Sequence, residues 1–452
     1  MFLLGSLQYL AALLEAPPNP YATRYTVYPI TTPTPKVTLS TSSFDVYLAI
    51  LMILVALLAG AVIISFHVLR RISEFKEQKS KEAASLGGSK DPANGNDPSR
   101  FPALTAIDQA LSEAPPAVFQ TSTLDKICYD FQQFAAHKHK LYYDISDVRR
   151  FIGGMGISKL ILLRGMSGTG KTSLAYVAGE YFANPSTVVP IQPMWKERSD
   201  MIGYFNEFTK KFNETTMLCK LYEAGGRQDV FITVLDEVNI ARVEYYFAEF
   251  LSLLELPEHR RYLDVVSDSW AHDPERLVGG KLLLPPNMWF VGTANNDDST
   301  FAISDKVYDR AAVLDLDKKC SPFVSESTPQ CHISYSELTH LFDEARSTYS
   351  LSAQGREALA SLDKYLNDTF RIGIGNRMIG QIERYVPIMI ACGATEDEAL
   401  DDMICRKILR KLEQLNPAFV RSQADSLLAK LAELFRSPEL SKQYVSMLKN
   451  TL

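Results

Sequence analysis

Gly165-Met166-Ser167-Gly168-Thr169-Gly170-Lys171-Thr172 is the stretch of the chain that decides the fold. It fits the pattern G-x-x-x-x-G-K-[ST], in which glycines let backbone N–H groups point around a β-phosphate. The apolar run Leu160–Leu163 precedes the loop and a helical pattern, Ser173–Phe182, follows it. This is the strand–loop–helix context that the motif requires. We therefore expect the loop to bind the phosphates of a nucleoside triphosphate.

Each residue type in the loop has a task in this interpretation. The ammonium of Lys171 would reach the β- and γ-phosphates, and the hydroxyl of Thr172 would ligate Mg²⁺. The predicted nucleotide-binding residues are Gly165, Ser167, Gly168, Thr169, Gly170, Lys171, Thr172 and Ser173. These residues do not distinguish ATP from GTP as the substrate.

A second apolar run, Phe231–Leu235, ends in the carboxylate pair Asp236-Glu237. Carboxylates at the carboxyl end of a parallel strand lie where ligands bind in such sheets. We expect Asp236 to hold Mg²⁺, through its water shell, and Glu237 to orient and activate the attacking water. The alternative is a solvated pair at a strand end, without chemistry.

A third apolar run, Met288–Thr293, leads to Asn295-Asn296. A side-chain amide there could hold the attacking water against the γ-phosphate. The sequence favours Asn295 for this task over Asn296, and an asparagine that merely forms a turn is the remaining alternative.

The composition argues against several other classes of protein. The formal net charge of −6 gives no basic footprint, so the overall charge does not indicate nucleic-acid binding, although a local contact stays open. The six cysteines are scattered without metal-ligand spacing, which argues against a disulfide framework or a zinc site. Helical patterns alternate with short apolar strands from Leu124 onward, as in a parallel α/β sheet. After about Ser334 only helical patterns remain, which predicts a helical lid.

An uncharged apolar segment lies near the N-terminus, from Val46 to Phe66. Its length of about 21 residues suits a helix that crosses a bilayer; a buried core helix is the alternative. Basic residues follow the segment more densely than they precede it, so the positive-inside rule puts the C-terminal part in the cytoplasm. We expect a single-pass protein of the cytoplasmic membrane, with its N-terminus outside and one helix in contact with lipid.

The predicted organisation has five parts. They are an extracytoplasmic segment (1–43), a transmembrane helix (44–69), a juxtamembrane and flexible linker (70–120), an α/β core (121–320), and a helical lid with C-terminal helices (321–452).

Beyond these motifs, the run from Leu235 through Asn239-Ile240-Ala241-Arg242 to Glu255 resembles the Walker B region of McrB-type AAA+ proteins. This family comprises the motor subunits of modified-cytosine restriction systems and their relatives. Three further stretches resemble the same family: Pro193–Tyr204, Leu284–Asn287, and Gly292–Asn295 with Ser304–Ala311. The resemblance spans roughly Asp147–Leu316.

The resemblance implies an AAA+ core with an insert in its second helix, here Pro190–Phe212, and assembly into a ring, commonly a hexamer. Arg310 matches the arginine finger that reaches the γ-phosphate of the neighbouring subunit. Arg377, within Gly375–Ile379, matches the lid arginine of AAA+ proteins. For each arginine, an ordinary surface residue is the alternative.

The expected function is a membrane-anchored nucleoside triphosphatase that drives or switches a separately encoded effector, such as an McrC-like nuclease subunit, in prokaryotic anti-phage defence. Two departures from the family matter: a membrane segment replaces the N-terminal DNA-reading domain, and no guanine-selecting residues are identified. One alternative is a MoxR-like chaperone that remodels a membrane or metal-containing partner. Another, from a different class, is a nucleotide-gated membrane scaffold that does not hydrolyse.

Overall fold

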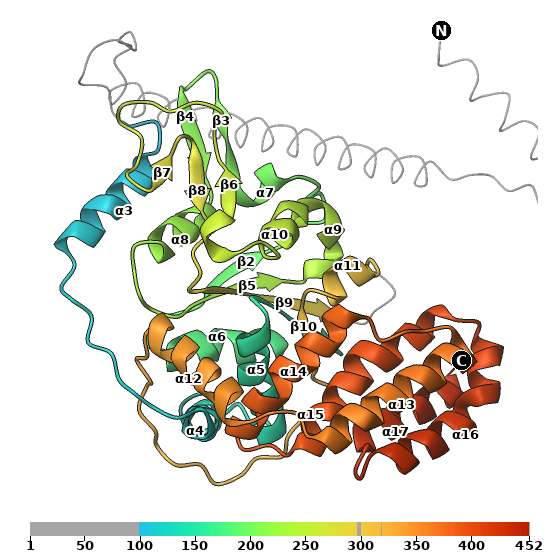
Figure 1. Cartoon of the computed structure of the whole chain (residues 1–452). Coiled ribbons are helices and arrows are strands. Elements are labelled where there is room, and N and C mark those ends of the chain that lie inside the picture. Colours follow the sequence, from blue (N-terminus) through green and yellow to red (C-terminus); the bar gives the residue numbers. More distant parts are fainter. Residues whose placement is uncertain (1–98, 296–299, 318, 452) are drawn as a thin grey trace, which may run out of the picture. The chain divides into compact units, whose positions relative to one another are not determined.

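A central parallel sheet organises the part of the chain that the computed structural model describes, residues 99–295, 300–317 and 319–451 (Figure 1). The predicted transmembrane helix (44–69), the segment before it and Asn296 lie outside the described residues. Among the residues that are described, no helix combines the length and apolar character needed to cross a bilayer.

The sheet contains five parallel strands in the order β10-β1-β9-β5-β2. Their bounds are β1 Leu160–Gly165, β2 Thr187–Pro190, β5 Phe231–Asp236, β9 Met288–Asn295 and β10 Ala312–Asp315. The three central strands are almost continuously buried, because helices cover both faces of the sheet. The predicted parallel α/β architecture is therefore confirmed.

The register of the sheet brings three predicted motifs to one edge. Gly165, at the end of β1, lies opposite Asn295 of β9. Leu235 of β5 lies opposite Gly292, so Asp236 continues beside Thr293. The phosphate loop, the acidic pair and the asparagine thus follow the carboxyl ends of three neighbouring strands.

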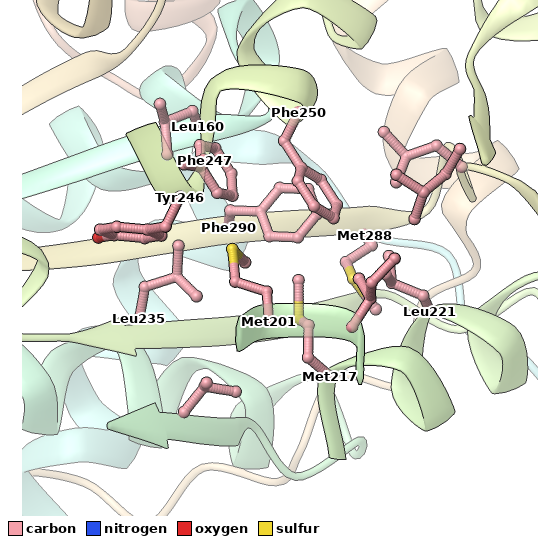
Figure 2. Close-up of a cluster of buried hydrophobic side chains, with 14 of the residues drawn as sticks. Leu160, Met201, Met217, Leu221, Leu235, Tyr246, Phe247, Phe250, Met288 and Phe290 are labelled. Carbon is pink, nitrogen blue, oxygen red and sulfur yellow. The ribbon is translucent and has the colours of Figure 1, made fainter. Parts of the chain in front are cut away.

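Two groups of helices cover the two faces of the sheet (Figure 1). One face carries α4 Leu124–His139, α5 Ile145–Ile157, α6 Lys171–Tyr181 and α12 Tyr335–Thr348. The other carries α8 Thr216–Ala224, α9 Val243–Tyr246 and α10 Ala248–Leu253. On this second face, Phe247 and Phe250 stack with ring centroids 5.0 Å apart, and both pack edge-on against Phe290 of β9 (Figure 2).

Two small antiparallel sheets are inserted into this framework. The range predicted as an insert, Pro190–Phe212, holds α7 Arg198–Ile202 and most of the hairpin β3 Gly203–Asn206 with β4 Lys211–Glu214. The second sheet combines β6 Tyr262–Asp264, β8 Lys281–Leu283 and β7 Leu277–Val278. Buried Arg100 stacks its guanidinium over Trp270 and binds Asp268 and Asp273, which fixes the long loop between β6 and β7.

The predicted linker 70–120 is wrong at its C-terminal end. Helix α3 Pro102–Glu113 lies inside that range, and both Phe101 and Leu104 are fully buried. The carboxylate of Glu214 accepts hydrogen bonds from the N–H groups of Ala103 and Leu104, which helix geometry alone leaves unpaired. Pro102 is compatible both with the end of a linker and with the first position of a helix. Only the tertiary contacts show that a helix begins there.

The predicted helical region after Ser334 is confirmed. Its elements after α12 are α13 Ala353–Phe370, α14 Asn376–Ala391, α15 Glu396–Met403, the π-helix η3 Ile404–Ile408, the 3₁₀ segment η4 Leu409–Gln414, α16 Pro417–Leu434 and α17 Glu439–Thr451. Leu338 and Phe342 of α12 belong to the core against the sheet, whereas a separate core begins at Leu351. The helical unit with its own core is therefore built mainly from α13 to α17.

Candidate active site

The phosphate loop owes its shape to its glycines. Gly168 and Gly170 have φ angles of 78° and 90°, in the left-handed region where a side chain is strained. At Gly165, a Cβ atom would lie only 2.5 Å from the carbonyl oxygen of Leu316. The loop then turns directly into α6 at Gly170, and no side chain caps the start of this helix, which leaves its first N–H groups available as in helix N-termini that bind phosphate.

Lys171 folds back onto the backbone of this loop. Its side chain is almost fully buried, and its ammonium donates hydrogen bonds to the carbonyl oxygens of Gly165 (3.0 Å) and Met166 (2.6 Å). From the other side, the hydroxyl of Tyr143 donates to the carbonyl oxygen of Gly170 at 3.0 Å. The loop is thus braced by two side chains before any nucleotide binds.

Asp236 meets two hydroxyl groups at the end of β5. The hydroxyls of Thr172 and Thr293 each donate to its Oδ1 atom at 2.8 Å. A threonine hydroxyl and a carboxylate are hard oxygen donors, and Mg²⁺ in nucleotide sites is commonly held by one or two such protein groups together with phosphate oxygens. The donor set at Thr172 and Asp236 therefore fits Mg²⁺.

Glu237 and Asn295 face each other beside this cluster. The backbone N–H of Glu237 donates to the Thr293 hydroxyl at 2.9 Å, and the side-chain amide of Asn295 reaches Glu237 Oε1 at 3.4 Å. Glu237 has a positive φ of 56°, which is costly for a residue with a side chain and is typical of functional sites. The structure thus brings Lys171, Thr172, Asp236, Glu237 and Asn295 to one place.

Sequence reasoning gave no role in this site to two residues, Thr293 and Asn239. Buried Asn239 donates from its amide to the carbonyl oxygen of Asn295 (2.8 Å) and to the hydroxyl of Thr300 (2.9 Å). Thr293 joins Asp236 to the backbone of Glu237. In the sequence, Asn239 follows the acidic pair closely and Thr293 precedes Asn295 closely, and this proximity is the signal that could have indicated a role in the site. The contacts themselves depend on the register of the sheet.

Arg310 and Arg377 lie elsewhere, at the amino ends of the strands. Both bind the same carboxylate: Arg310 Nη2 lies 2.9 Å from Glu255 Oε2, and Arg377 Nη2 lies 2.7 Å from Glu255 Oε1. Strand β1 has 6 residues, so about 17 Å of sheet separates this edge from the phosphate loop. Within one chain, neither arginine is brought to the phosphate loop.

The two arginines line a cavity of about 660 Å³ that reaches the start of β1 and β9. Its basic residues outnumber its acidic ones two to one: Lys159, Arg261, Arg310, Arg346, Arg377 and Arg384 against Glu255, Glu258 and Asp309. The Lys159 ammonium lies 3.5 Å from the centre of the Trp289 ring, and burial lowers the pKa of this lysine to about 7. The excess of basic groups suits an anionic partner.

The short helix α11 Asp305–Tyr308, just before Arg310, is held from two directions. Arg164, directly before the phosphate loop, donates to the hydroxyl of Tyr308 at 2.9 Å and pairs with Asp315 at 2.8 Å. From the helical unit, Lys407 donates to the carbonyl oxygen of Tyr308, and Gln381 donates to that of Asp309. The segment that carries Arg310 is therefore connected both to the strand before the phosphate loop and to the helical unit.

Burial by itself would raise the pKa of Asp315, but Arg406 and Arg164 beside it hold the pKa below its usual range. Arg406, in the π-helix η3 of the helical unit, also binds Asp402 at 2.5 Å. A continuous chain of buried charges thus joins the phosphate-loop strand to the helical unit. Removing one member would leave a buried charge without its partner, which is strongly destabilising.

The fold and this site together have the arrangement that P-loop nucleotide-binding proteins use. A family model described as a domain of unknown function, DUF8727, matches residues 327–451, the helices from α12 to α17. No curated protein matches the chain.

Many solved structures resemble the fold, and two of them serve as examples. One is a protein from Cytophaga hutchinsonii ATCC 33406 described as a candidate ATPase, with a TM-score of 0.42, 14% identity, and coverage of 68% of this chain and 93% of that one. The other is a full-length MCM homologue from Methanopyrus kandleri, with a TM-score of 0.37, 11% identity, and coverage of 70% and 63%.

Proposed function

We propose that this protein is an AAA+ nucleoside triphosphatase that hydrolyses ATP or GTP in a ring of identical subunits. One observation carries the proposal: the residues predicted to bind a nucleotide and activate water gather at one sheet edge, while both predicted arginines share one carboxylate at the other edge. A single chain therefore holds two complementary halves of a catalytic site. Two adjacent copies would combine them.

Binding begins at the phosphate loop. The ammonium of Lys171, freed from the loop carbonyls, would pair with the β- and γ-phosphates, while the loop N–H groups surround the β-phosphate. Thr172 and Asp236 would hold Mg²⁺, which when bound neutralises charge between the β- and γ-phosphates. Because Thr172 and Asp236 already lie within hydrogen-bond distance of each other, these two residues need little rearrangement, and Lys171 makes the main movement.

Attack on the γ-phosphate is the task of Glu237 and Asn295. The Glu237 carboxylate would accept a proton from the attacking water, and the Asn295 amide would hold that water in line. The tether from Asn295 through Asn239 to the loop after β9 fixes the amide at the strand end. A scaffold that merely binds nucleotide has no need of this arrangement.

Arg310 and Arg377 would act on the nucleotide of the neighbouring subunit. A finger supplied in trans is worth about 10³ to 10⁵ in kcat. The excess of basic groups in the cavity that they line supports an anionic partner at this face. The ring is then part of the catalytic mechanism, and a hexamer is the number that the family resemblance implies.

The cellular role follows from the sequence motifs. We place the motor at a cytoplasmic membrane, anchored by residues 44–69, where it would drive a separately encoded, McrC-like effector in defence against phage. The run Asn239-Ile240-Ala241-Arg242 after the acidic pair supports this role over that of a MoxR-like chaperone.

Mixing two inactive variants tests the composite site. Arg310→Ala should bind nucleotide normally and hydrolyse it orders of magnitude more slowly, and Glu237→Gln should also be inactive. In a mixed ring, an Arg310→Ala subunit supplies intact Glu237, and its Glu237→Gln neighbour supplies intact Arg310. We expect mixing to restore part of the activity. No rescue, with subunit exchange demonstrated by fluorescence energy transfer between labelled subunits, would refute the trans site.

A further inference from the structure

We infer that Glu255 is a positioning residue for hydrolysis, which holds Arg310 and Arg377 together for presentation to the nucleotide of the next subunit. The inference rests on the proposed function and adds a residue to it. Glu255 follows α10, on the face of the sheet opposite α5 and α6, and no part of the phosphate site contacts it among the interactions of the described residues.

The contacts of Glu255 join three separate parts of the fold. Its two carboxylate oxygens bind different arginines, one from the segment after α11 and one from the start of α14 in the helical unit. Arg310 is further fixed because its Nη1 atom donates to the carbonyl oxygen of Lys306 at 2.8 Å. One carboxylate thus sets the distance between two guanidinium groups that would otherwise be independent.

The backbone that carries Glu255 is rigid. Phe250 and Leu251 of α10 are buried in the core, and the N–H groups of Leu254 and Glu255 donate to the carbonyl oxygens of Phe250 and Ser252. Only the side-chain torsions of Glu255 are left to move. A carboxylate mounted on packed backbone can orient long arginine side chains, each of which has many rotamers of its own.

The charges explain why a carboxylate is needed at this place. Two guanidinium groups drawn to one position repel each other, and Glu255 offsets that repulsion. One carboxylate against two cations still leaves an excess positive charge, so the pair remains attractive to phosphate. Each guanidinium also has five N–H donors, of which the contacts described here use one or two. The pair can bind phosphate without first leaving Glu255.

Folding does not account for this arrangement. The side chains of Arg310, Glu255 and Arg377 are 23%, 35% and 55% exposed, and ion pairs that are partly open to solvent add little to stability. A large effect of Glu255 on turnover would therefore arise from the positions of the arginines.

The first test measures turnover and nucleotide affinity of Glu255→Ala in the full chain. A misplacement of about 1 Å costs up to about 10²-fold in rate, so we expect kcat to fall about 10- to 100-fold with unchanged affinity of the isolated subunit for a fluorescent ATP analogue. Glu255→Gln keeps the shape and should lose less. The matched control is Glu249→Ala on α10, the helix that precedes Glu255; it removes an ion pair with Arg198 and should keep normal turnover. Wild-type kcat in Glu255→Ala would overturn the inference.

The second test decides on which side of the subunit interface Glu255 acts. Glu255→Ala mixed with Glu237→Gln should regain turnover, because the Glu237→Gln subunit supplies an intact Glu255 with both arginines. Glu255→Ala mixed with Arg310→Ala should gain no turnover, because neither variant presents a correctly positioned Arg310 to its neighbour.

The two proposals fail in different ways. If Arg310→Ala and Glu237→Gln do not complement each other in exchanging rings, the proposed function is wrong. If they do, and Glu255→Ala regains activity with Arg310→Ala instead, only the assignment of Glu255 is wrong.

Discussion

The carboxyl and amino edges of the central sheet carry the two halves of the proposed catalytic site, and they are built differently. At the carboxyl edge, short side chains and backbone groups contact one another directly, with Thr172 and Thr293 both 2.8 Å from Asp236. At the amino edge, long arginine side chains meet a single glutamate beside a cavity of about 660 Å³. The groups of the carboxyl edge contact one another within one chain, whereas the cavity at the amino edge leaves room for a group from a second molecule.

This difference has a physical consequence. Short side chains on strand ends lose little conformational freedom when they bind a ligand, so the carboxyl edge is ready to accept a nucleotide. Arginine side chains lose up to about 2 kcal/mol of rotamer entropy each when they are fixed. A shared carboxylate at the amino edge would offset part of that cost before a neighbour arrives. Substitutions at the two edges should therefore affect different steps.

A large effect is expected at the carboxyl edge, for Glu237→Gln. The amide keeps the size and hydrogen bonding of the side chain but is a far weaker base, so turnover should fall by about 10² to 10⁴-fold while nucleotide still binds. Phosphate release and equilibrium binding measure the two quantities separately. Lys171→Ala is the contrasting variant and should lose binding as well. Unchanged turnover in Glu237→Gln would show that another group is the base.

Arg377→Ala tests the amino edge. A charge-assisted hydrogen bond contributes about 1.5–3 kcal/mol, so we expect turnover of the ring to fall roughly 10- to 100-fold. Nucleotide affinity of the isolated subunit should not change, because Arg377 binds Glu255 far from the phosphate loop of its own chain. If the nucleotide affinity of the isolated Arg377→Ala subunit falls instead, Arg377 acts on the nucleotide of its own chain, and the two edges do not serve separate steps.

The two edges also differ in how far the sequence could predict them. The phosphate loop and Asp236-Glu237 follow from local patterns, because each motif lies within a few residues of a strand end. Thr293 and Asn239 could not be assigned, since their contacts depend on the register between β5 and β9. Arg377 was recognised only as a lid arginine. Its partnership with Arg310 results from the packing of α14 against the core, although 66 residues of chain lie between Arg310 and Arg377.

A smaller effect is expected for Asn239→Ala, which tests whether the carboxyl edge depends on its buried hydrogen bonds. Losing the amide removes one hydrogen bond from the carbonyl oxygen of Asn295 and one from the hydroxyl of Thr300, at about 0.5–1.5 kcal/mol each, while the Thr300 hydroxyl still donates to Asn295 at 3.3 Å. We expect roughly tenfold slower turnover with little change in binding, because Asn295 loses its tether while the phosphate loop is untouched. Reduced binding with normal turnover of the bound fraction would contradict this role.

The smallest effect concerns the charge of Lys159 at the amino edge and its dependence on pH. Burial outweighs the attraction of Glu258 and lowers the pKa of Lys159 to about 7, against a value near 10.4 in the unfolded chain. Between these two values the unfolded chain binds a proton that the folded chain lacks, so this group makes the folded state more stable as pH rises. Lys159→Met, of similar volume, lacks that contribution.

We therefore expect the stability of the wild type relative to Lys159→Met to increase by about 1 kcal/mol from pH 7 to pH 8. Urea unfolding of both proteins at the two pH values measures this difference, and contributions from other titrating groups cancel between the variants. A difference that does not change with pH would mean that Lys159 stays charged in the fold, held by the Trp289 ring 3.5 Å away. The amino edge would then carry one more permanent positive charge toward the neighbour's phosphates, and the contrast with the carboxyl edge would become sharper.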